Sequence, residues 1–158
     1  MVYNIFIPLC LHSEVLKLSL KIFSLTVAIV LLYNSCKKKN NNDSVPLTTV
    51  DITINTSLPS YIALHTVGNY LYVTGGVRGL LVYRKTTTDF MAYDRNCTYQ
   101  SSQPCATVIV DATHIIATDT CCHSKFSIYD GSVTQGPAVS PLKAYQTSFD
   151  GTYLHIFN

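Results

Sequence analysis

Charged side chains are scarce in this sequence of 158 residues, since Lys, Arg, Asp and Glu together make up only 13% of it. After Cys36 nine basic residues remain (the eleven of the chain less Lys17 and Lys21) against eight acidic ones (nine less Glu14). A surface that binds the phosphates of nucleic acid needs a clear excess of Lys and Arg. The near balance therefore argues against a nucleic-acid partner.

Several motifs of catalysis and metal binding are also missing. No Ser-His-Asp order, glycine-rich phosphate loop or pair of catalytic carboxylates can be argued from the sequence. Hydrolase and nucleotide-binding functions therefore have no support, and we predict no catalytic residue. The absence of a Cys-x-x-Cys spacing makes a structural zinc site a weak case.

Apolar residues are concentrated near the N-terminus. The run from Leu16 to Leu32 is uncharged from Ile22 onward, which is the length of a signal-peptide core and too short to span a bilayer. It is followed by Ser35-Cys36 and a polar stretch rich in lysine and asparagine, a pattern that resembles a bacterial lipoprotein signal. We expect a signal peptide over 1–35, lipidation of Cys36 and a polar tether over 36–49.

The alternative is a plain transmembrane anchor with Cys36 left on the outer side. Both interpretations predict an extracytoplasmic domain anchored to the membrane of a bacterial cell envelope, with an unidentified envelope protein as its partner.

Residues 50–158 show the alternation and turn signals of β-strands and no amphipathic helical pattern. The richness in Val, Ile, Thr and Tyr favours an all-β sandwich or barrel of short antiparallel strands. The strands are expected at 50–55, 61–64, 70–74, 79–84, 90–93, 107–110, 114–118, 126–128, 144–148 and 153–157.

Four cysteines remain once Cys10 is removed with the signal peptide and Cys36 carries lipid: Cys97, Cys105, Cys121 and Cys122. An extracytoplasmic address permits disulfides, and a domain of this size gains from them. Four cysteines allow three pairings, which the sequence does not separate.

Two stretches resemble the Rieske iron–sulfur family. Residues 92–98 look like its first cluster loop; Phe126, Gly131, Gly136-Pro137-Ala138, Pro141-Leu142, Tyr145 and 149–156 look like its second half. The resemblance covers 50–158 and implies a Rieske-like fold with an inserted subdomain of two cluster-type loops. It also implies a 2Fe-2S cluster, bound by Cys-x-His in the first loop and Cys-x-x-His in the second.

The ligand positions depart from that pattern. The first loop keeps Cys97 but has Tyr99 at the histidine position. Without a gap, the second loop has Asp119 at the cysteine position, Cys122 at the histidine position and His123 at a glycine, with Cys121 as the bridging cysteine. With a one-residue deletion His123 becomes the ligand, Cys122 the bridging cysteine and Thr120 the lost ligand.

Three interpretations of the site follow. In the first, a cluster is bound by Cys97, Cys122 and His123, with Cys105 or Asp119 completing the set. In the second, the disulfides Cys105–Cys121 and Cys97–Cys122 replace the cluster. In the third, the cysteines bind zinc or act as a vicinal thiol pair. We favour the second. The protein is then a binding or structural module without a cofactor and not an enzyme. The alternative is an electron-transfer protein, related to Rieske oxidoreductases, with altered 2Fe-2S ligands.

Overall fold

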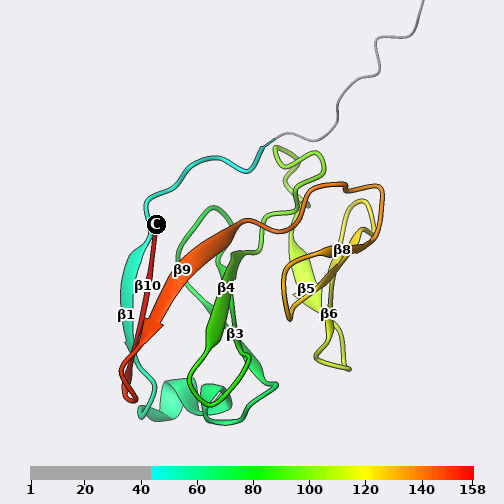
Figure 1. Cartoon of the computed structure of the whole chain (residues 1–158). Coiled ribbons are helices and arrows are strands. Elements are labelled where there is room, and N and C mark those ends of the chain that lie inside the picture. The colour runs from blue at the N-terminus through cyan, green and yellow to red at the C-terminus, as the bar shows by residue number, and fades with distance from the viewer. Residues whose placement is uncertain (1–43) are drawn as a thin grey trace, which may run out of the picture. The chain divides into compact units, whose positions relative to one another are not determined.

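Ten short strands and a 3-10 helix form the described part of the computed structural model, residues 44–158 (Figure 1). The all-β prediction is confirmed. The expected signal peptide and Cys36 lie outside the described residues. The elements in chain order are β1 (Asp51–Asn55), η1 (Pro59–His65), β2 (Tyr70–Val73), β3 (Leu80–Arg84), β4 (Phe90–Asp94), β5 (Val108–Val110), β6 (Ile116–Asp119), β7 (Lys125–Ser127), β8 (Val133–Gln135), β9 (Ala144–Phe149) and β10 (Tyr153–Phe157).

A six-stranded antiparallel sheet joins the two ends of the domain in the order β1-β10-β9-β4-β3-β2. Side chains of a strand alternate between its two faces. Ile54 is paired with Leu154, and both side chains are buried together with Ile156. The apolar alternation of β1 and β10 therefore fixes the register, because a slip by one residue would expose these side chains.

The second sheet is inserted between β4 and β9 and has four strands in the order β5-β6-β7-β8. Its strands follow one another along the chain as antiparallel hairpins. The fully buried Val108 and Phe126 join Tyr93 of β4 in one hydrophobic cluster. The predicted subdomain with its loops is therefore present, and it is packed against the larger sheet.

Two local predictions are corrected. The segment 61–64, expected as a strand, lies in η1. Pro59 at the start fixes a helical φ, and the short helix buries only Leu64 of its seven residues. The prediction missed β8, whose three residues include one apolar side chain, at Val133.

Residues 44–49, assigned to the tether, contact the domain. The carbonyl of Ser44 accepts a hydrogen bond from Ser101 (3.3 Å), that of Pro46 from Lys143 (3.0 Å), and that of Thr48 from Asn158 (3.0 Å). Val45 between them is buried. The end of the tether is therefore part of the folded domain.

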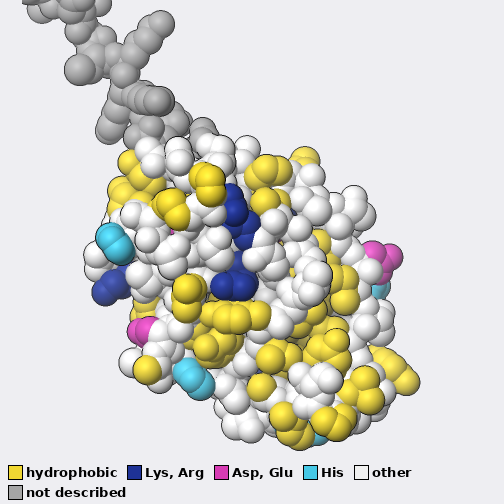
Figure 2. All heavy atoms as spheres, turned by 180° about the vertical axis from the view of Figure 1, so that it is seen from behind, with side chains coloured by type: hydrophobic (Ala, Val, Ile, Leu, Met, Phe, Trp, Pro, Cys, Tyr) yellow, Lys and Arg dark blue, Asp and Glu magenta, His cyan; other side chains and the backbone are white. Residues whose placement is uncertain are grey.

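The surface carries few charges and several exposed apolar side chains. Figure 2 shows one face on which apolar and uncharged atoms predominate around a small basic group. Leu47 and Val139 are 92% and 72% exposed. Within residues 44–158 no helix has the length and apolar character needed to cross a bilayer.

Candidate functional site

Three loops of the four-stranded sheet meet at the site. The first loop (95–107) follows β4, the second (120–124) joins β6 to β7, and the third (136–143) precedes β9. The Thr98 hydroxyl donates to the carbonyl of Ser140 (2.6 Å), and the Ala138 N–H donates to the Ser124 hydroxyl (2.9 Å). These bonds hold the first and second loops against the third.

A disulfide joins the first and second loops. Cys105 is bonded to Cys121, with their Cα atoms 5.4 Å apart. This distance lies in the usual range for a disulfide. The predicted Cys105–Cys121 bridge is confirmed. Cys121 rather than Cys122 is the bridging cysteine, which is the pairing that the register without a gap assigns.

His123 lies apart from the other cluster-type residues. Its side chain is exposed, and its φ is +60°. A left-handed conformation is uncommon outside glycine, and the register without a gap places His123 on a glycine of the Rieske pattern. His123 is not in the group of close ligand-type atoms formed by Cys97, Asp119 and Cys122.

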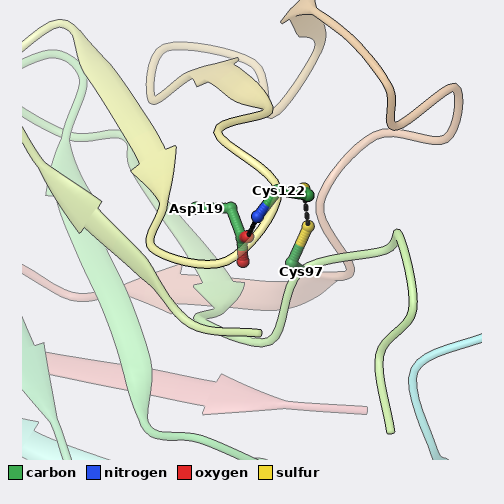
Figure 3. Close-up of side chains that lie close together, drawn as sticks. All are labelled: Cys97, Asp119 and Cys122. Carbon is green, nitrogen blue, oxygen red and sulfur yellow. Dashed lines mark hydrogen bonds between the residues drawn. The ribbon is translucent and has the colours of Figure 1, made fainter. Parts of the chain in front are cut away.

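The thiols of Cys97 and Cys122 face each other (Figure 3). Their sulfurs are 3.9 Å apart, and both cysteines are free. The second bridge that we favoured is thus not formed in the structure, since a disulfide needs about 2.05 Å between sulfurs. Cys97 is fully buried, and burial raises the pKa of its thiol above the ordinary range.

Hydrogen bonds orient both sulfurs. The N–H of Tyr99 points to the Cys97 sulfur at 3.4 Å, while the Tyr99 side chain packs against the core. The Cys122 sulfur lies 3.0 Å from the hydroxyl of Ser124. Sequence reasoning missed Ser124, which is fully buried, because its role depends on the third loop and no motif marks it.

Asp119 ends β6 with a fully buried carboxylate beside the two sulfurs. Its Oδ1 accepts hydrogen bonds from the N–H groups of Cys121 (2.8 Å) and Cys122 (2.6 Å). Its Oδ2 has no hydrogen-bond partner among the described residues. A buried oxygen without a partner costs free energy, so this atom is a place where a ligand would be favourable.

These residues do not fit a 2Fe-2S cluster of the Rieske kind. In that arrangement the two histidines share one iron, so Cys97 and Cys122, at a cysteine and a histidine position, would bind different irons. Two sulfurs on one tetrahedral metal ion, each about 2.3 Å from it, are about 3.8 Å apart. The observed 3.9 Å is therefore a separation for one ion, and it leaves no room for a two-iron core between the sulfurs.

No protein-family model matches the chain, and no curated protein matches it. Several solved structures are similar in fold, and three of them follow. A ferredoxin of carbazole 1,9a-dioxygenase from Nocardioides aromaticivorans IC177 is 18% identical, with 70% of this chain and 98% of that chain covered and a TM-score of 0.43. A ferredoxin from Sphingomonas yanoikuyae B1 is 17% identical, with 59% and 88% covered and a TM-score of 0.41.

The third is a complex of reduced oxygenase and oxidized ferredoxin in carbazole 1,9a-dioxygenase, 16% identical, with 73% and 94% covered and a TM-score of 0.42. These neighbours are Rieske-type ferredoxins, the kind of protein that the sequence resembles. At such identities and TM-scores the likeness decides neither membership of a family nor function.

Proposed function

We propose that this chain is an envelope lipoprotein whose Rieske-like domain binds no 2Fe-2S cluster and acts as a binding or structural module. The observation that carries the proposal is the 3.9 Å separation of the Cys97 and Cys122 sulfurs, which suits one ion better than a two-iron core. Tyr99 and Asp119, at the positions of a histidine and a cysteine ligand, support it.

The disulfide supports the extracytoplasmic address. Disulfides persist outside the cytoplasm and are rare within it. Cys105 is exposed and Cys121 half-buried, so a reducing compartment would have access to the bond. Lipid at Cys36 would then hold the domain at the membrane.

A protein partner suits the surface of the domain better than nucleic acid. The near balance of charge gives little net attraction for the phosphates of nucleic acid. A pocket of about 370 Å³ between residues 44–47 and the first and third loops has mainly apolar walls, and the exposed Leu47 is one of its lining residues. Exposed apolar surface of this kind is typical of protein contacts.

The proposal is tested with the full chain purified anaerobically from a bacterial host. We expect no charge-transfer bands in the visible spectrum, no EPR signal after reduction, and no stoichiometric iron and sulfide. A 2Fe-2S signal at one cluster per chain would overturn the cluster-free assignment in favour of electron transfer with altered ligands.

Lipidation is tested separately. We expect the chain to incorporate labelled fatty acid and to fractionate with membranes, and Cys36→Ala to lose the label. The Cys97→Ala variant is the matched control, because it also removes one cysteine and should keep the label. An unlabelled parent chain, or label that survives in Cys36→Ala, would contradict lipidation at Cys36.

A further inference from the structure

The first observation concerns the distance between the free thiols. Two sulfurs 3.9 Å apart, each at the usual 2.3 Å from one ion, subtend about 115° at that ion, close to the tetrahedral angle. A linear two-thiolate site would need the sulfurs further apart. The spacing therefore suits a single tetrahedral cation such as Zn²⁺.

The second observation is the carboxylate beside them. Ligand atoms of Cys97, Asp119 and Cys122 all lie within 4.8 Å of one another. Two N–H groups on Oδ1 fix the Asp119 side chain, and Figure 3 shows the bond from Cys122. Oδ2 is buried without a partner among the described residues. A cation bound among these ligand atoms would compensate the buried carboxylate, and metal-binding carboxylates are commonly oriented by such hydrogen bonds.

The third observation concerns the surroundings of the sulfurs. The Tyr99 N–H and the Ser124 hydroxyl lie beside one sulfur each, at 3.4 and 3.0 Å, and both can stabilise a thiolate. Cys122 is only partly buried, so an ion has access from its side. Solvent on that side can complete a four-coordinate shell.

We propose that Cys97, Cys122 and Asp119 form a binding site for one Zn²⁺-class ion, with solvent as the fourth ligand. The set of two thiolates and one carboxylate suits zinc, and it differs from the ligands of a Rieske cluster. Binding displaces one proton from each thiol, and no electrons are transferred. This inference rests on the proposed function in one respect, because it requires that no two-iron cluster fills the loops.

The experiment uses the full chain, purified anaerobically and treated with a chelator, and titrates it with Co²⁺ and then with Zn²⁺. We expect one Co²⁺ to bind per chain, with sulfur-to-cobalt charge-transfer absorption in the near ultraviolet and the visible absorption bands of tetrahedral Co²⁺. One Zn²⁺ per chain should then displace the Co²⁺. The affinity should fall at least a hundredfold in Cys97→Ser and Cys122→Ser. It should fall at least tenfold in Asp119→Asn.

Asp111→Asn is the matched control, since Asp111 is an exposed carboxylate in the β5–β6 turn whose side chain accepts hydrogen bonds from Thr113. It should bind within twofold of the parent. A second measurement avoids dependence on the folding of variants: Zn²⁺ should slow alkylation of Cys122 in the parent chain at least tenfold.

Chains with two titratable thiols that bind neither ion would overturn the inference, and so would a Cys97–Cys122 disulfide found by mass spectrometry in protein kept anaerobic. Both results leave the cluster-free proposal standing. An iron–sulfur spectrum of the untreated protein would instead overturn the proposed function and this inference with it.

Discussion

Removing the disulfide between the first and second loops should destabilise the domain by a predictable amount. The bond joins residues 16 apart in the sequence. Closing a loop of that size in the unfolded chain corresponds to about 3 kcal/mol in the chain-entropy model. Cys105 is exposed and Cys121 only half-buried, so Cys105→Ser/Cys121→Ser adds little loss of packing to this figure.

The expected readout is thermal unfolding followed by circular dichroism. A domain of about 110 residues has an unfolding entropy of about 0.23 kcal/mol/K, so 3 kcal/mol lowers Tm by about 13 °C. Reductant should lower the Tm of the parent chain by a similar amount. It should leave the double variant unchanged, which provides the internal control.

Two results would refute this reasoning. A double variant that melts within about 2 °C of the parent would show that the bond constrains little in the unfolded chain. A further fall of the variant's Tm in reductant would show that another disulfide contributes to stability.

Three further predictions concern the core. Asp94 is fully buried and accepts hydrogen bonds from the N–H groups of Val77 and Arg78 and from the Tyr145 hydroxyl. Asp94→Asn should therefore lower the free energy of unfolding, measured in urea, by about 3 kcal/mol. A loss of less than about 1 kcal/mol would contradict this role. Gly131→Ala should cost about 2 kcal/mol or more, because φ is +75° and a Cβ would lie 2.7 Å from the Tyr93 ring; Gly68→Ala, at φ +84° in open space, is the control and should cost about 1 kcal/mol. Burial raises the pKa of Tyr93 and Tyr145 above the ordinary 10.0. Their contribution to the free energy of unfolding is therefore complete below about pH 10 and is lost above it, by up to about 1.4 kcal/mol per pH unit for each tyrosine. Urea unfolding measured at pH 9 to 11 would contradict this prediction if stability stayed constant.

The strands were predictable where the apolar alternation in the sequence matches the side chains that the fold buries. The segments 70–74, 79–84 and 90–93 each contain aromatic or branched residues between turn signals, and they form β2, β3 and β4. The helix η1 was not predictable from its apolar letters, since a short run such as 61–64 suits a strand or a buried turn equally well.

The residues of the site could be named from the sequence, but their geometry could not. Cys97, Asp119 and Cys122 lie at positions that the Rieske resemblance marks. Whether the thiols are bonded, and which carboxylate oxygen lacks a partner, depends on how three loops distant in the sequence pack together. Ser124 illustrates this dependence, because it contacts Cys122 locally and Ala138 only through the fold.

The hydrogen bond from Ser101 to the carbonyl of Ser44 sets how far the site can be from a membrane. Ser44 is eight residues after Cys36, and an extended chain covers at most about 3.6 Å per residue, or about 29 Å in all. With lipid on Cys36, the bonded point of the first loop could rise no further than that from the headgroups. A partner of the first loop would then have to bind within reach of the bilayer surface, whether it is itself in the membrane or not.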